Sequence, residues 1–473
     1  MSEAAQSASE AAQSVTSARP GFVDAGVASA VRREILTWAW LAVGALAVAG
    51  VFALLLALSR IPGMDAAPFW PLEFFYKGLV IHVVFSLVIW LLGIFAFLVS
   101  VATLEARGEA MRAAPLGRIG QGLVICAFPC LFAPAFLNAS QPELTNYVPL
   151  IRHPVYDLGL VFLALGVLSP VARIGLNLGG GKRPPLMFAM SVAGLIYVVA
   201  LALFALAFGL LARWAGFAPS HDQLLWGGGH VLQFVYATLL IVNWRILARR
   251  SLGEAAVPEG AFRVSVSIVG ALALAAPFFY AIFAPFSEEQ RQAFRFLQFG
   301  LSVPTLAFAI PLVRNVRGER LPWRDPAFFA LAMSLALFAL GGVMGFLITG
   351  SDTRTPAHYH AVITAVSVSS AGMLLTFGLD KVGRKPAPAG VARMAFALYG
   401  GGQFVASIAM FVAGGYGALR KTPDGVSSLD AVAAAGMAVH GIASIFTILG
   451  GAAFVIVAIR ALMRPTQTMR ASP

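Results

Sequence analysis

Charged residues are scarce in this sequence of 473 residues. Asp, Glu, Lys and Arg make up 11% of it, whereas soluble domains carry about a quarter. Hydrophobic residues reach 59%, which is more apolar surface than a soluble domain can bury. The composition therefore excludes a soluble fold. It predicts an all-α polytopic membrane protein that is surrounded by the lipid bilayer.

The charges that are present give a net charge of +12, but they are dispersed between apolar segments. A nucleic-acid surface needs its basic residues gathered in one patch. We therefore expect no nucleic acid among the partners.

Cysteine is equally scarce, since Cys126 and Cys130 are the only two. They lie four residues apart on one apolar helix, a spacing that favours packing over a disulfide or a zinc site. No C-x-x-C-H motif occurs, so no c-type heme is expected to be attached. The first twenty residues lack an apolar run and repeat SEAAQS, which indicates a disordered tail and not a signal peptide.

Apolar runs of about 20 residues predict twelve transmembrane helices. These are expected near residues 36–58, 76–103, 117–138, 153–175, 185–212, 222–247, 263–284, 291–313, 326–349, 356–379, 391–415 and 431–459. One membrane domain then covers residues 31–462, with a disordered cytoplasmic tail at 1–30 and a second cytoplasmic tail at 463–473.

The basic residues also predict the orientation of these helices. Of the 33 Lys and Arg, 24 lie in the tails and in the loops that follow even-numbered helices. The positive-inside rule then places both termini in the cytoplasm, and a bacterial inner membrane is the expected location.

Four of the seven histidines are expected at one membrane depth, near the outer ends of three helices. They are His82, His230, His358 and His360. Two residues along a helix amount to a rotation of about 200°, so His358 and His360 point to opposite sides. Imidazoles from neighbouring helices are common ligands of heme iron. The alternative is that each is a lone histidine bonded to a backbone carbonyl.

Here the sequence resembles subunit I of the heme-copper oxidases, a superfamily that includes cytochrome oxidases and nitric oxide reductases. The segment GGVMGFLITGSDTRTPAHYHAV (Gly341–Val362) is similar to its ninth and tenth helices, where an A-H-[FY]-H run binds both hemes. The resemblance implies that His358 is the proximal ligand of a high-spin heme. It also implies that His360 and His82 together bind a low-spin heme. We expect both hemes to be b-type, although the sequence by itself does not name the heme type.

Three further residues are implicated by the same resemblance. The segment GYGALRKTPD (Gly415–Asp424) is similar to the loop whose paired basic residues hold heme propionates, and this gives that role to Arg420 and Lys421. Asp352 matches an acidic position near the propionates, one residue out of register. The alternative for all three residues is a solvated loop.

The resemblance breaks at the second metal, copper or non-heme iron, which faces the high-spin heme in that superfamily. His230 in WGGGHVLQF matches its first ligand. Counting back from SVPTL (Ser302–Leu306) places the other two ligands at Phe278 and Phe279, which cannot bind a metal. Phe234 stands where a redox-active tyrosine or a glutamate is usual. The second metal is therefore expected to be absent.

Three functions remain open from the sequence. The first is a di-heme oxidoreductase that passes electrons to a heme that binds O₂ or NO. The second is a degenerate electron-transfer, gas-sensing or structural subunit, and the third is a heme-free transporter. A quinol or a separate cytochrome c-type subunit would donate the electrons. The role of His440, a bonded core histidine or a substitute ligand, stays open.

Overall fold

The computed structural model describes residues 25–58, 74–145, 148–179, 183–214, 220–348, 352–420 and 429–464. Backbone groups in a bilayer must bond within the chain, so the apolar runs fold as helices. The α-helices are α2 (Ala25–Leu58), α3 (Phe74–Val83), α4 (Trp90–Arg107), α5 (Pro115–Phe132), α6 (Pro154–Leu176), α7 (Pro185–Trp214), α8 (His221–Leu252), α9 (Glu259–Ala275), α10 (Phe279–Ile282), α11 (Glu288–Phe299), α12 (Ser302–Asn315), α13 (Pro326–Phe346), α14 (Arg354–Met373), α15 (Leu379–Lys381), α16 (Ala389–Phe396), α17 (Gly402–Gly415) and α18 (Ala431–Met463).

Short elements interrupt or connect these helices. Strands β1 (Gln141–Glu143) and β2 (Leu150–Arg152) pair antiparallel, with Gln141 opposite Arg152. Single 3₁₀ turns are η3 (Gly108–Ala110), η4 (Ala133–Phe136), η5 (Glu254–Ala256) and η6 (Ala276–Phe278). Three π-helical turns, which often mark functional sites, are η2 (Val84–Ile89), η7 (Leu374–Gly378) and η8 (Ala397–Gly401).

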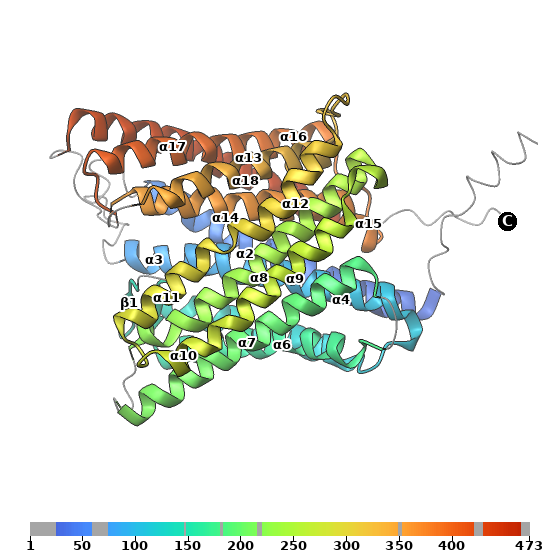
Figure 1. Cartoon of the computed structure of the whole chain (residues 1–473), viewed down its shortest axis with the longest axis horizontal. Helices are drawn as coiled ribbons and strands as arrows, with labels where there is room; N and C mark the ends of the chain where they lie inside the picture. The colour runs from blue at the N-terminus through green and yellow to red at the C-terminus, as the bar shows by residue number, and fades with distance from the viewer. Residues whose placement is uncertain are drawn as a thin grey trace, which may run out of the picture.

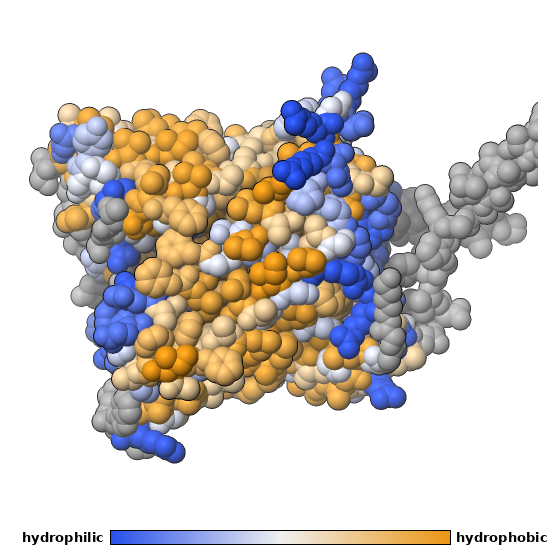
Figure 2. Space-filling view, viewed as in Figure 1, coloured by the Kyte–Doolittle hydropathy of each residue, from blue (hydrophilic) through white to orange (hydrophobic). Residues whose placement is uncertain are grey.

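The prediction of twelve membrane helices is confirmed within the described residues. Twelve segments are long and apolar enough to cross a bilayer, from Arg32–Leu58 to Ala431–Met463. Figure 1 shows them running lengthwise as one bundle. Figure 2 shows hydrophobic side chains over the middle of the visible face and hydrophilic ones at its two ends, as a bilayer requires.

The two ends of the bundle differ in what they carry. We call one the histidine end, because α3, α8 and α14, which carry His82, His230, His358 and His360, begin there. Helix α18 and the β1–β2 hairpin lie at the same end (Figure 1). We call the other the Ala25 end, where α2 begins and α18 ends. Helices α8 and α14 lie at the centre and are buried along most of their length.

The predicted boundaries shift at some points. Helix α2 begins at Ala25, earlier than the boundary expected at residue 31. The remainder of the predicted N-terminal tail, residues 1–24, and most of the C-terminal tail, 465–473, lie outside the described residues. Cys126 and Cys130 are both free on α5, where Cys126 is exposed on a membrane span and Cys130 is partly buried.

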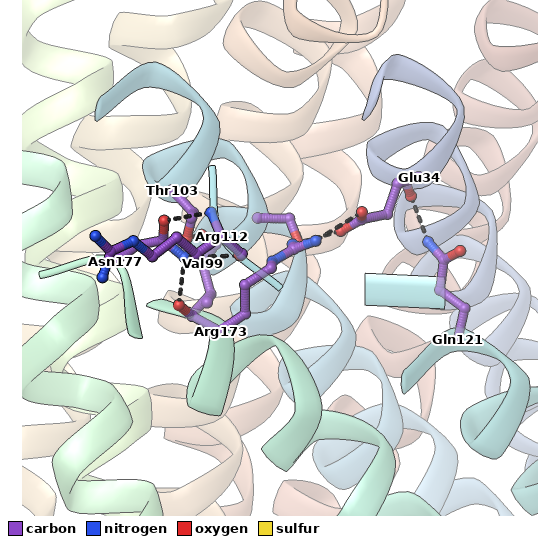
Figure 3. Close-up of polar contacts among 8 residues, drawn as sticks. Glu34, Val99, Thr103, Arg112, Gln121, Arg173 and Asn177 are labelled. Carbon is purple, nitrogen blue, oxygen red and sulfur yellow. Dashed lines mark hydrogen bonds and ion pairs between the residues drawn. The ribbon is translucent and has the colours of Figure 1, made fainter. Parts of the chain in front are cut away.

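A buried ion pair joins four helices near the Ala25 end (Figure 3). Glu34 on α2 accepts hydrogen bonds of 2.8 and 2.5 Å from Arg173 on α6, and Arg173 also donates to Ser100 on α4. Gln121 on α5 donates to the backbone carbonyl of Glu34. A Cβ on Gly117 would lie 2.2 Å from the Glu34 carboxylate, so only glycine fits there.

Candidate heme and metal site

Four histidines in the bundle share one hydrogen-bond pattern, in which Nδ1 contacts a backbone carbonyl oxygen. A carbonyl only accepts, so Nδ1 carries the hydrogen and Nε2 keeps the lone pair that binds a metal. The contacts are His82 to Ala49 (3.0 Å), His230 to Trp226 (2.6 Å), His358 to Gly341 (2.7 Å) and His440 to Ala406 (3.3 Å). Metal-binding histidines are oriented by such bonds, although a merely buried histidine also makes them.

Helix α13 positions the imidazole of His358. Besides the bond to Gly341, the ring lies against Gly345, where a Cβ would stand 2.8 Å from the His358 Cε1. The glycine therefore leaves room for an imidazole to lie flat on α13. One turn away, Gly342 has nothing within 4 Å of the corresponding position.

His360 lies two residues further along α14. Its ring centroid is 5.0 Å from that of Tyr359, and the two rings are stacked. The pairing of His360 with His82 across one iron stays a prediction. Because the His82 Nδ1 carries the hydrogen that bonds the Ala49 carbonyl, its Nε2 has the lone pair for an iron. This fits the donor set that a bis-histidine heme needs.

The loop before α14 pairs with the loop after α17. Asp352 bridges to Leu419, and the Thr353 amide donates to the Ala418 carbonyl at 3.0 Å. This brings Asp352 close enough to Arg420 for their charges to interact. Lys421 lies outside the described residues.

Arg354 binds Asp352 directly, a contact that we did not predict. Its guanidinium donates to both carboxylate oxygens, the shortest contact being 2.7 Å. These bonds, helped by the charge of Arg420, hold the pKa of the Asp352 carboxyl below its ordinary value. The sequence carried a signal, because Arg354 precedes His358 by four residues and so lies on the same face of α14.

The surroundings of His230 are aromatic. Its ring lies 4.6 Å from that of Trp226 and 5.9 Å from that of Phe294, and Phe294 in turn packs on Phe279 at 5.2 Å. Phe278 is 64% exposed and faces away from the bundle. Of the two positions counted from Pro304, only Phe279 therefore packs towards His230.

Within the residues that the structure describes, no group of three His, Cys, Asp or Glu side chains could hold a metal ion. Phe234 is fully buried. The donors that copper or non-heme iron needs do not gather around His230 in this part of the chain. His230 alone is a poor fit for a second metal.

Comparison with known proteins decides the family. The model of the family "Cytochrome C and Quinol oxidase polypeptide I" matches residues 34–445. The chain belongs to this family. It is thereby a member of the heme-copper oxidase subunit I superfamily, and the sequence-based resemblance is confirmed.

The individual proteins that are similar to this chain have low sequence identity to it. An uncharacterized protein of Aquifex aeolicus (strain VF5) is 29% identical over 347 residues, covering 70% of this chain and 81% of the relative. Uncharacterized protein RP382 of Rickettsia prowazekii (strain Madrid E) is 24% identical over 495 residues, covering 89% and 94%. A heme-copper terminal oxidase dimer solved by cryo-EM has a similar fold, with a TM-score of 0.77 and 18% identity over 93% of this chain and 85% of its own.

Proposed function

We propose that this oxidase-family protein is a di-heme oxidoreductase whose second metal site has been lost. His82 and His360 would hold a low-spin b-type heme, and His358 would hold a high-spin one. A bis-histidine heme carries single electrons when bound, and a heme with one imidazole leaves a face open to a gas such as O₂ or NO. The electron donor would be a quinol or a cytochrome c-type subunit.

The observation that carries this proposal is the anchoring of the imidazoles. His82 and His358 each have Nδ1 bonded to a carbonyl of a neighbouring helix, so the ring is oriented and Nε2 is the basic nitrogen. Gly345 has no Cβ, so the His358 ring can lie against α13 at this position. Asp352, Arg354 and Arg420 gather at the same end of the bundle, where cations would meet the heme propionates.

The loss of the second metal is supported by the residues around His230. Trp226, Phe279 and Phe294 pack there, and none of the three offers a metal ligand. The same residues favour the second candidate function, a subunit that transfers electrons or senses a gas without catalysis. Family membership argues against a heme-free transporter.

The test is the cofactor content of the purified protein. We expect about two b-type hemes per chain, of which one binds carbon monoxide, and copper and non-heme iron each below about a tenth per chain. A heme-free preparation would overturn the di-heme proposal. Stoichiometric copper or non-heme iron would overturn only the loss of the second metal. Turnover with O₂ and with NO, measured side by side, then separates an enzyme from a subunit without catalysis.

A further inference from the structure

A loop rich in arginine joins α12 to α13 at the Ala25 end of the bundle. Its sequence is RNVRGERLPWR (residues 314–324), and we call it the arginine loop. Its four arginines are all exposed: Arg314, Arg317, Arg320 and Arg324. Among the described residues, none of these four guanidinium groups forms an ion pair, whereas Arg250 at the same end binds Asp380 at 2.7 Å. The loop therefore presents a concentrated positive charge at the surface.

Hydrogen bonds at both ends hold the arginine loop in place. The side chain of Asn315 donates to the Ala256 carbonyl in η5 at 3.2 Å. The Asp325 carboxylate accepts from the Ala327 amide at 2.7 Å, so it caps α13. Between these ends the chain turns at Gly318, whose φ of +88° favours glycine. An ordered loop presents its arginines at a smaller entropic cost of binding.

The face of α12 that leads to this loop is apolar and exposed. Its members recur at steps of three and four residues, so they form one stripe along the helix. They are Val303, Leu306, Ile310 and Val313. In a membrane protein such a stripe contacts the lipid chains. Arg314 follows this stripe directly and Arg317 follows one turn after Val313, so both lie where the hydrocarbon ends and the headgroups begin.

Trp323 indicates the same membrane depth from the other side of the loop. Its side chain is 54% exposed, and its ring packs edge-on against that of Phe328 on α13 with a centroid distance of 5.0 Å. Tryptophan is enriched at the membrane–water interface because its ring is apolar and its indole N–H bonds polar groups. An exposed tryptophan among arginines is therefore typical of a segment at the headgroups.

The direction of the arginine loop favours lipid over a soluble partner. Figure 1 shows it (gold, upper right) standing out sideways from the bundle, and Figure 2 shows the same projection as hydrophilic. Sideways here means across the direction of the helices. The loop consequently extends over the lipid that surrounds the bundle.

We propose that the arginine loop binds the phosphate groups of anionic phospholipids, with Trp323 inserted at the interface beside them. A guanidinium matches two phosphate oxygens in a bidentate contact, and clustered arginines are attracted to an anionic membrane surface. Phosphatidylcholine carries a cation beside its phosphate, so the loop prefers phosphatidylglycerol. This binding needs no heme and goes beyond the proposed function.

The affinity for each lipid is measured by native mass spectrometry of the full chain in detergent, titrated with phosphatidylglycerol and with phosphatidylcholine. The loop variant replaces all four arginines: Arg314→Gln, Arg317→Gln, Arg320→Gln and Arg324→Gln. Its affinity for phosphatidylglycerol should fall about tenfold or more, while its affinity for phosphatidylcholine stays within about twofold. The milder pair Arg317→Gln, Arg320→Gln should show a smaller loss of the same kind.

A matched control removes the same number of charges from the same end of the bundle. It replaces four exposed arginines outside the loop: Arg112→Gln, Arg118→Gln, Arg460→Gln and Arg464→Gln. This variant should keep its affinity for phosphatidylglycerol within about twofold. Equal losses in the control and the loop variant would overturn the proposal, because net charge alone would then explain the binding.

The fluorescence of Trp323 tests the contact at the loop itself. Its own emission is the difference between the unmodified protein and Trp323→Phe, both in vesicles that contain a fixed fraction of brominated lipid. Brominated phosphatidylglycerol should quench this emission about twice as strongly as brominated phosphatidylcholine, and the preference should vanish in the loop variant and in concentrated salt. Equal quenching by the two lipids would overturn the proposal. Quenching by neither lipid would also overturn it, in favour of an acidic protein as the partner of the loop.

Discussion

At the scale of single residues, His82 tests the assignment of the low-spin heme. Its replacement by alanine removes one of two axial bonds to the same iron, so the low-spin spectrum should be lost while much of the high-spin spectrum remains. Reduced-minus-oxidised absorbance and electron paramagnetic resonance of the purified variant measure this. His440→Ala serves as the comparison, and we expect it to keep both hemes. A full low-spin spectrum in His82→Ala would mean that the pairing with His360 is wrong.

Gly345 tests the position of the His358 ring. Alanine at this position would bring its Cβ to 2.8 Å from the His358 Cε1, so the imidazole must move off α13. We expect affinity for the high-spin heme to fall about 10- to 100-fold, measured by heme titration of the apoprotein. Gly342→Ala on the same helix meets nothing within 4 Å and should bind heme normally. Equal heme binding by the two variants would contradict this account.

Asp352 gives a prediction for pH. Its folded pKa lies below the ordinary value of about 3.9, chiefly because Arg354 donates to its carboxylate. The ionised Asp352 carboxylate therefore stabilises the folded state fully above about pH 5, and this stabilisation is lost as pH falls through the folded pKa. The melting temperature of the protein should exceed that of Asp352→Asn at neutral pH, and the difference should shrink below about pH 4. A difference that stays constant across this range would show that the charge contributes nothing.

At the scale of helices, the ion pair between Glu34 and Arg173 fastens α2 to α6. Arg173→Met would leave the Glu34 carboxylate buried without its cation, and we expect a loss of about 3–5 kcal/mol in unfolding free energy. The double variant Glu34→Gln, Arg173→Met should recover most of this loss, because no charge is then left unpaired. Denaturation in detergent micelles measures both variants. A double variant as unstable as the single one would argue that packing, and not charge, is what is lost.

The helices themselves were predictable, whereas their polar contacts were not. Apolar length locates each membrane helix because the bilayer imposes it, as with 185–212 against α7 at Pro185–Trp214. Glu34 and Arg173 stand 139 residues apart in the chain, and nothing local in either helix indicates the partner. The aromatic packing of Phe294 on His230 likewise depends on how α11 meets α8. Counting from Pro304 located Phe279 near His230 but could not show that Phe278 faces outward.

At the scale of the whole molecule, the distribution of basic residues predicts the orientation in the membrane. Both termini should face the cytoplasm, since 24 of the 33 Lys and Arg belong to that side. A green fluorescent protein fused after Arg464 should therefore fluoresce, while alkaline phosphatase at the same place should be inactive. A fusion after Gly415, in the opposite loop, should give the reverse pattern. Active phosphatase after Arg464 would invert the assignment.

The π turn η2 follows His82 directly, between α3 and α4. Such a turn holds more residues than an α turn, so the register of the helix changes between His82 and Trp90. Removing one residue from Val84–Ile89 would turn His82 by about 100° relative to α4 and carry its imidazole away from its present neighbours. An alignment with a relative that lacks the turn consequently needs a one-residue gap inside a membrane helix, where gaps are ordinarily penalised most heavily.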